Sequence, residues 1–271
     1  MRIDKRFVAS AIFIVSVFIA LLKADLIINQ NGNGTAVIAG GGNGSITIAQ
    51  GTPIAHYADI TFYDAMDSST TGRAPTKGSG TLTISGDTIV PGPPLNSSST
   101  ACLYGTTNAG FKRVGVTASG NLNYSAGRAG FYFVWDTATN DSSTAFGWLP
   151  SGDTTPRFAF RKSNSGNSWA FKYEDVSVSL ALTAGTTYYV EVEWDDSKAH
   201  GFCAGLRTDG GTFTTSNSCT TGPPSNTTFG LLGDSILNSG HSLNGRMDEV
   251  IISSDSQRDL YAIRNLGAYP N

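Results

Sequence analysis

From about position 60 onward, apolar residues recur in short runs separated by polar turns. The runs are rich in Val, Ile and aromatic residues, which is typical of β-strands. After a first run that begins at Ile60, the predicted strands occupy residues 80–84, 88–90, 115–124, 130–136, 157–162, 169–173, 176–182, 186–194, 201–207, 228–232 and 247–253. Many short strands with turns between them predict an all-β, antiparallel two-sheet sandwich.

The end of the chain departs from this pattern, because a helix is predicted directly after the last strand. Ser254 and Gln257 have the spacing of a capping box. A helical apolar stripe follows, formed by Leu260, Ile263 and Leu266. The sequence therefore predicts a short C-terminal helix that closes the sandwich.

Residues 245–250 read Gly-Arg-Met-Asp-Glu-Val and resemble the last core strand of laminin G-like domains, where Gly-x-Ile-Asp-Glu-Val is usual. The segment that begins at Ile60, with its aromatic strand, acidic turn and Asp-Ser-Ser, resembles the opening of the same domains. These domains belong to the concanavalin A-like lectin/glucanase superfamily. The resemblance implies a jelly-roll sandwich over residues 55–271.

The N-terminus has a different pattern. Residues 1–6 carry three basic residues, and residues 7–22 are apolar apart from two serines. Sixteen residues of helix would span roughly 24 Å, somewhat less than the roughly 30 Å of a bilayer core. Residues 1–24 are thus predicted to form a hydrophobic helix, as a cleaved signal peptide, an uncleaved membrane anchor or a pilin-like packing helix. Each interpretation exports the chain from residue 25 onward.

Residues 25–54 are rich in Gly and Asn and contain two β-prone runs, one after Asn31 and one after Gly42. The runs predict a hairpin or a paired spacer. Exposed strand edges also allow pairing between subunits, so a filament or another self-associated state is the alternative.

Composition excludes one class of partner. Of the 271 residues only 14% are charged, and the net charge is -3. A chain without a basic patch lacks the electrostatic basis for binding nucleic acid.

The segment 186–196 places Glu191, Glu193 and Asp195 on one face of its predicted strand, because side chains alternate. Paired carboxylates can act as acid and nucleophile in glycoside hydrolysis, and some glucanases of the superfamily have a related motif. The order of Glu and Asp departs from that motif, and the residues that usually flank it are missing. A solvated strand face is therefore the favoured interpretation, and a catalytic site is the alternative.

The resemblance also implies a calcium site where the opening turn meets the last strand. The matching positions are Asp64, Asp67 and Asp248, and carboxylate oxygen is a ligand that Ca²⁺ prefers. The alternative is that Asp67 caps a turn and that Asp248 accepts hydrogen bonds from backbone amides.

Aromatic side chains are the candidates for sugar contact. Tyr132, Trp148, Trp169 and Tyr173 are predicted to lie on a concave face, where their rings would stack on sugars. The alternative is that these rings fill the core, as large aromatic residues on sandwich strands often do.

The chain has three cysteines, of which Cys203 and Cys219 flank a Gly- and Thr-rich loop and are the candidates for a disulfide. Six Asn-x-Ser/Thr sequences are candidate glycosylation sites: Asn33, Asn43, Asn96, Asn123, Asn140 and Asn226.

Together these features favour a secreted or cell-surface protein that binds glycans or surface glycoproteins. The first alternative is a structural subunit of a surface filament or coat. The second is a polysaccharide-degrading hydrolase. The membrane would be a partner through residues 7–22 if the helix is retained.

Overall fold

The computed structural model describes residues 57–85, 89–97, 99–106, 113–137, 139, 143–148, 158–162, 167–220, 227–233 and 243–265, together with one N-terminal strand pair. The chain divides into two compact units, residues 1–48 and 49–271, whereas the sequence placed the boundary after residue 54. The predicted N-terminal helix, and with it the signal peptide or anchor, lies outside the described residues.

In the first unit, β1 (Val37–Ala39) pairs antiparallel with β2 (Ser45–Thr47), and Ile38 lies opposite Ile46. This pair confirms that the two β-prone runs pair with each other.

Among the described residues, none of the helices has both the length and the apolar character needed to cross a bilayer.

In the second unit, one sheet has eight antiparallel strands, of which seven follow one another and β3 pairs with β17 beside them. In spatial order they are β15 (Thr214–Ser216), β14 (Ala204–Thr208), β13 (Tyr188–Asp195), β8 (Ala126–Trp135), β17 (Gly245–Ser253), β6 (Cys102–Gly105) and β5 (Ile89–Gly92), with β3 (Ile60–Asp64) beside β17.

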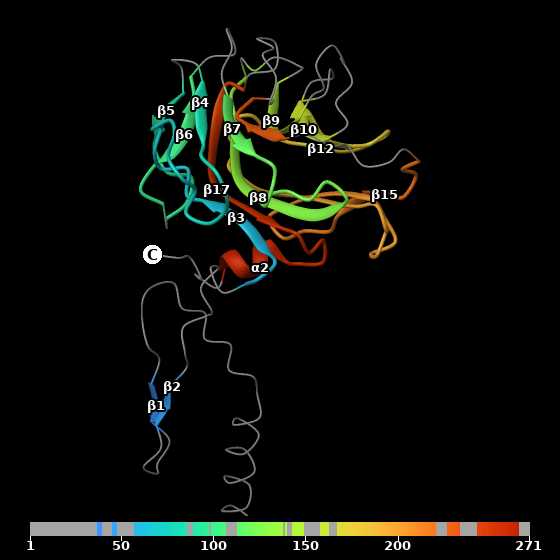
Figure 1. Ribbon diagram of the computed structural model, residues 1–271, viewed down its shortest axis with the longest axis horizontal. Helices are drawn as coiled ribbons and strands as arrows, with labels where there is room; N and C mark the ends of the chain where they lie inside the picture. Colours follow the sequence, from blue (N-terminus) through green and yellow to red (C-terminus); the bar gives the residue numbers. More distant parts are fainter. Residues whose placement is uncertain are drawn as a thin grey trace, which may run out of the picture. The chain divides into compact units, whose positions relative to one another are not determined.

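The other sheet has seven antiparallel strands. In order they are β12 (Val176–Ala181), β11 (Ser168–Tyr173), β10 (Phe158–Lys162), β9 (Thr144–Trp148), β16 (Thr228–Leu231), β7 (Arg113–Thr117) and β4 (Thr83–Ser85). The two sheets lie face to face, with β7, β9, β10 and β12 in one layer and β8 in the other (Figure 1). The predicted all-β two-sheet sandwich is confirmed.

Aromatic rings from both sheets fill the space between the layers. Alternate residues of β8 point inward, and the ring of Phe133 lies 4.6 Å from that of Trp169 on the opposite sheet. Trp194 of β13 makes the equivalent contact with Phe158 of β10, at 4.9 Å. Aromatic pairs at these distances add stability beyond the area they bury. The core therefore follows from the period-two pattern of the sequence.

Strand β17 is central to the larger sheet. It pairs with β8 on one side, and on the other side first with β6 and then with β3. The change of partner coincides with a bulge between Asp248 and Ile251, where Glu249 has a φ of 49°. A left-handed non-glycine residue in a bulge redirects the strand and the side chains beside it.

The C-terminal helix α2 (Leu260–Asn265) confirms the predicted helix but begins later than the capping box implies. Asp259 caps it, because its carboxylate accepts a 2.9 Å hydrogen bond from the backbone N–H of Ala262. The predicted cap, Ser254, instead donates to the carbonyl of Asp59. The prediction of the cap was wrong because contacts with this distant residue hold the segment before the helix in turns.

Leu260 and Ile263 bury the inner face of α2 against Ile60 and Ile251, in a small apolar cluster on the outer side of the larger sheet. The helix thus lies against the larger sheet, in contact with β3 and β17 through this cluster and also with β8 and β13 (Figure 1).

Candidate functional site

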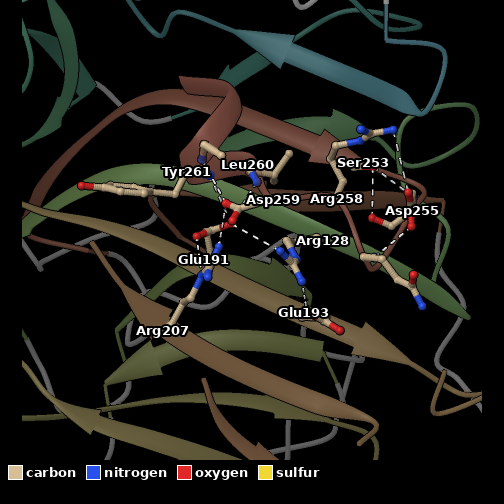
Figure 2. Close-up of polar contacts among 12 residues, drawn as sticks. Arg128, Glu191, Glu193, Arg207, Ser253, Asp255, Arg258, Asp259, Leu260 and Tyr261 are labelled. Atoms are coloured by element: carbon tan, nitrogen blue, oxygen red, sulfur yellow. Dashed lines mark hydrogen bonds and ion pairs between the residues drawn. The ribbon is translucent and has the colours of Figure 1, made fainter. Parts of the chain in front are cut away.

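The three carboxylates of β13 lie on one face of the strand, but they are not solvated. Glu191 and Glu193 are completely buried, and Asp195 is 2% exposed. The interpretation as a solvated strand face was therefore wrong. The turn and helix that follow β17 cover this face (Figure 2), and strand periodicity cannot reveal a cover supplied by a distant part of the chain.

Glu191 connects β13 to the beginning of α2. One carboxylate oxygen accepts a 2.6 Å hydrogen bond from Nε of Arg207. The other accepts backbone hydrogen bonds from Leu260 at 3.2 Å and Tyr261 at 3.4 Å, and Nη1 of Arg128 lies 3.8 Å away (Figure 2). The first N–H groups of a helix lack partners within the helix, so a carboxylate at this place satisfies them.

Glu193 forms a buried ion pair with Arg128 and a 2.6 Å hydrogen bond with Nδ1 of His200. Burial raises the pKa of Glu193, and the charges and hydrogen bonds of Arg128 and His200 oppose that rise. The guanidinium groups of Arg128 and Arg207 lie 4.9 and 4.6 Å from the ring centre of Phe213. These cation–π contacts fix both arginines opposite the two glutamates.

Asp195 orders the turn after β13 and also holds the C-terminal segment. Its carboxylate accepts hydrogen bonds from the backbone and hydroxyl of Ser197, from the backbone of Ala199 and from the hydroxyl of Ser256. Burial alone would raise the pKa of Asp195, but these hydrogen bonds lower it below its ordinary value. The aspartate is therefore held in its ionised form.

Glu191 and Asp195 consequently act in the folded protein as anchors for the segment 253–261, whereas Glu193 is bound to Arg128 and His200. Glycoside hydrolysis needs one carboxyl group that can protonate the leaving oxygen and a second that can approach the sugar ring. A sugar would reach Glu191 only if this segment left the sheet, and it would reach Glu193 only if Arg128 and His200 released that carboxylate. The geometry of the folded chain does not present the predicted catalytic residues to a ligand.

The predicted calcium ligands do not come together. Asp64 forms a two-point ion pair with Arg73, in which Nη2 lies 2.6 Å from Oδ1, and it also accepts a backbone hydrogen bond from Met66. Asp67 is exposed. Across the described residues, Asp64, Asp67 and Asp248 do not form a group whose ligand oxygens lie within 4.8 Å of one another. The expected gathering was wrong because Arg73 already neutralises Asp64.

Asp248 lies at the bulge of β17 and is completely buried. It accepts hydrogen bonds of 2.9 Å from the backbone N–H of Leu95 and from the hydroxyl of Ser99. The same hydroxyl oxygen lies 3.2 Å from Oε1 of Glu249. Burial raises the pKa of Asp248 to about 7 in spite of these donors. The alternative prediction, in which Asp248 accepts a backbone hydrogen bond, is confirmed.

Three of the four aromatic candidates for sugar contact are buried. Trp169 and Tyr173 are fully covered between the sheets, and the hydroxyl of Tyr173 donates a 2.9 Å hydrogen bond to the carbonyl of Tyr124. Tyr132 is 6% exposed, and the guanidinium of Arg264 lies 4.5 Å from its ring centre. The prediction of exposed stacking rings is wrong for these three because their strand positions face the core or the helix. The side chain of Trp148 lies outside the described residues.

The predicted disulfide between Cys203 and Cys219 is confirmed, with 6.3 Å between the Cα atoms. Disulfides are typical of proteins that fold in oxidising, extracytoplasmic compartments. The third cysteine, Cys102, is a buried thiol.

Of the candidate glycosylation sites, Asn123 is exposed and Asn96 is partly buried and hydrogen-bonded to Ser99. The side chains of the other four candidates lie outside the described residues: Asn33, Asn43, Asn140 and Asn226. Accessibility of Asn123 is necessary for modification, but the modification itself stays a prediction.

The outer face of the seven-stranded sheet has a different character. One row of cross-strand neighbours runs over its middle, and most of its members have small side chains. The row consists of Ser177, Lys172, Ala159, Gly147, Gly230, Gly115 and Thr83. The four small members of the row, Ala159, Gly147, Gly230 and Gly115, are themselves buried, so a ligand could enter this face only where it is hollowed.

A hollow of about 150 Å³ lies at the β7 end of this row. Its lining residues are Thr81, Thr83, Arg113, Gly115, Val116, Thr117 and Thr228. Hydroxyl groups can donate and accept hydrogen bonds, and a guanidinium donates several in one plane. The hollow therefore offers the polar groups that a hydroxylated ligand needs.

Positive charge accompanies this hollow. Arg113, Arg161 and Lys172 lie at outward positions of β7, β10 and β11, whereas the seven strands of this sheet contain no Asp or Glu. Burial lowers the pKa of Lys172, and the nearby charge of Arg161 lowers it further. We define the small-residue row, the hollow and these three cations as the cationic face.

The sequence contained part of this signal. Side chains alternate along residues 113–117 and 158–162. Because the Val and Phe residues of these strands face the core, Arg113 and Arg161 are placed on the outer face of the sheet. The row itself depends on β16 pairing between β7 and β9, which are far apart in the sequence. That pairing cannot be obtained from local periodicity.

The comparison with known proteins establishes the fold. No family model matches the chain, and no curated protein matches its sequence. A solved structure of Trypanosoma rangeli sialidase in complex with sialic acid has a TM-score of 0.54 and 13% identity, over 86% of this chain and 35% of the sialidase. The binding domain of Paraclostridial Mosquitocidal Protein 1 has a TM-score of 0.52 and 10% identity, over 78% of this chain and 52% of that domain.

The chain thus spans between about a third and a half of these solved chains. Such low identities carry information about fold alone. The chain shares the two-sheet antiparallel sandwich fold of these solved structures.

Proposed function

We propose that this chain is an exported glycan-binding protein and that its ligand, an acidic glycan, binds on the cationic face. The fold supports the proposal because one similar structure is a sialidase in complex with sialic acid and another is a binding domain. The disulfide supports export. Within the concanavalin A-like sandwiches, the motif at residues 245–250 favours a laminin G-like module.

The observation that carries the proposal is the combination of positive charge with a hollow lined by threonine hydroxyls on the same face. Arg113, Arg161 and Lys172 lie on strands of a sheet whose strands contain no Asp or Glu, although the whole chain has a net charge of -3. Sugar carboxylates and sulfates form charge-assisted hydrogen bonds with such groups, and these are stronger than neutral ones. Neutral hydroxyls of the same sugar would meet the threonines of the hollow.

An array of glycans probed with the full chain tests the proposal. Glycans with sialic acid, uronic acid or sulfate should bind more tightly than their neutral counterparts, and binding should weaken as salt is raised, because salt screens exposed charges. Lys172→Gln should weaken binding of the acidic glycans about 10-fold, the effect of losing one hydrogen bond to a charged group. Arg246→Gln is the matched control, because this half-buried cation belongs to the larger sheet.

A second variant tests the hollow. A Cβ added at Gly115 would have its nearest neighbour at 3.6 Å, the carbonyl oxygen of Thr83, which is an ordinary contact. Gly115→Ala should therefore fold normally and still reduce binding by filling the hollow. An array on which no glycan binds would refute the function, whereas binding that both variants leave unchanged would refute the location.

A further inference from the structure

Strand β12 forms one edge of the seven-stranded sheet, and this edge is open. The strand pairs with β11 on one side in a continuous register. On its other side, none of the strands that the structure describes pairs with it. An unpaired edge presents a row of backbone N–H and C=O groups that can bond to another strand. The edge of β12 is therefore a candidate interaction surface.

The other edges of the two sheets are protected. The segment between β3 and β4 covers both of these strands, because Lys77 forms a bridge with β3 and Arg73 forms one with the residue before β4. Strand β5 contains Pro91, which lacks a backbone N–H, and β15 has only three residues. Proteins use such features to prevent sheet edges from associating. Strand β12 has none of them, because it is six residues long and regular and contains neither proline nor charge.

Three residues of β12 direct their backbone groups to the open side. The N–H of Leu182 donates to the carbonyl of Asn167, so the even-numbered residues of this segment are the ones that bond to β11. Bonded and non-bonded positions alternate in an antiparallel pair. The N–H and C=O groups of Ser177, Ser179 and Ala181 therefore point away from β11, and the side chains of these three residues are exposed.

Along its length this edge carries no charge. No charged residue occurs between Val176 and Val190, or in the segment 210–220 that contains β15. Strands β12 and β15 contact each other across the two layers, and Figure 1 shows them on the same side of the sandwich. Like charges directly opposite each other would destabilise the pairing of two identical edges. The uncharged edge avoids this cost and suits a second copy of itself.

We propose that β12 pairs antiparallel with β12 of a second copy of this chain, so that one sheet continues through both copies. The two-fold axis passes at Ser179, which places Ser177 opposite Ala181 of the second copy. Every outward backbone group of the strand then has a partner, and the three residue pairs give about six main-chain hydrogen bonds. Pairing about a two-fold axis is closed, so the assembly stops at two chains.

The side chains on the inner side of the sheet support this register. Val178 lies opposite Leu180 of the second copy, so the apolar row of the core continues across the axis. Leu180 is only partly buried in the single chain, because the sheet ends there. An axis one residue further along would require pairing by Thr183, whose N–H already donates to the hydroxyl of Tyr188 at 3.0 Å. An axis one residue earlier would require pairing by Asp175, which belongs to the hairpin turn.

The charged groups beyond the edge do not oppose the pairing. The acidic hairpin turn, formed by Glu174 and Asp175, would lie opposite Thr183 and Ala184 of the second copy, which carry no charge. The Lys172 side chains of the two copies would lie about 20 Å apart, from the spacing and rise of the strands, and salt screens exposed charges at that distance.

The pairing would also join the cationic faces of the two copies. Ser177 begins the small-residue row of that face, and a two-fold axis through the sheet keeps both outer faces on the same side. A glycan with several acidic groups could then contact both copies at once. The pairing itself does not depend on the proposed function.

Cysteine cross-linking of the full chain tests both the pairing and its register. In a hydrogen-bonded antiparallel pair the Cα atoms lie roughly 5.5 Å apart, a distance that a disulfide can span. Ser179→Cys should therefore form a disulfide-linked dimer on mild oxidation, seen on a non-reducing gel. Ser177→Cys is the matched control, because this residue is exposed on the same edge. In the proposed register its two copies are offset by roughly 13 Å along the strands and should not cross-link.

A proline variant provides the second measurement. Ser179→Pro removes an N–H that the single chain does not use, so the chain should fold, while the dimer loses two hydrogen bonds at the axis. The Kd of dimerisation, measured by sedimentation equilibrium in a non-ionic detergent, should rise about 30-fold. The proposal is overturned if the chain stays monomeric at every concentration or if its mass exceeds two chains. It is also overturned if Ser179→Cys cross-links no better than Ser177→Cys, or if Ser179→Pro leaves dimerisation unchanged.

Discussion

Replacing Asp248 by Asn should change the pH dependence of stability in a way that can be calculated from the structure. Asp248 is completely buried at the bulge of β17, and burial raises its pKa from 3.8 to about 7. The folded chain therefore keeps this proton up to about pH 7, whereas the unfolded chain releases it near its ordinary pKa. Between these values the unfolded state binds fewer protons, so stability falls as pH rises.

The size of the effect follows from the difference between the two pKa values. At 1.36 kcal/mol for each pH unit, the ionised carboxylate costs the folded chain about 4 kcal/mol above pH 7 and nothing below about pH 4. Asn has no such cost and can still accept the backbone hydrogen bond from Leu95. The hydrogen bond with Ser99 must rearrange when Asp248 becomes Asn, which reduces the gain in stability by about 1 kcal/mol. Asp248→Asn should therefore be about 3 kcal/mol more stable than the unsubstituted chain at about pH 8, and nearly equal to it at about pH 4.

Urea unfolding of both proteins at these two pH values measures the difference directly. Asp67→Asn is the control, since this exposed carboxylate should change the free energy of unfolding by less than about 0.5 kcal/mol at either pH. Buried acids that do not interact with Asp248, such as Glu174, affect both proteins equally and cancel in the comparison. If Asp248→Asn and the unsubstituted chain differ by the same free energy of unfolding at both pH values, burial does not hold Asp248 in its protonated form.

Two further predictions concern the closure of the sandwich. Leu260→Ala should lower the free energy of unfolding in urea by about 2 to 5 kcal/mol, because it leaves a cavity beside Ile60 and Ile251. A loss below about 1 kcal/mol would show that the helix is not packed firmly against the sheet. Replacing Cys203 and Cys219 by Ser opens a loop of 16 residues and should cost about 3 kcal/mol, seen as a lower Tm. An unchanged Tm of the unsubstituted chain in reductant would contradict the second prediction.

Much of the fold could be predicted because the relevant information is local. The apolar run at residues 130–136 identified strand β8, and the apolar residues of α2 identified its buried face. The cap of α2 was not predictable, because Ser254 was assigned from its own neighbours, whereas its hydroxyl contacts Asp59 at the other end of the domain. The local signal was present, but a long-range contact overrode it.

The candidate sites show the same limit more strongly. Alternation correctly placed Glu191, Glu193 and Asp195 on one face of β13, yet it could not show whether that face is solvated. Likewise Asp64 and Asp248 lie on neighbouring strands as expected, but Arg73 neutralises the first. Residue type and parity were right in both cases, and the partners were missed because they lie in other elements.

Spacing along the chain is enough to predict the all-β class, the positions of most strands, the closing strand and helix, and the disulfide loop. The folded arrangement was needed to show that Glu191 and Asp195 hold the C-terminal segment and that Gly115, Gly147 and Gly230 form one row. It also decided that Glu174 is buried without a hydrogen-bond partner among the described residues. The physical reason is that side-chain direction has a period of two residues along a strand, whereas burial and charge compensation depend on contacts between strands that are far apart in the sequence.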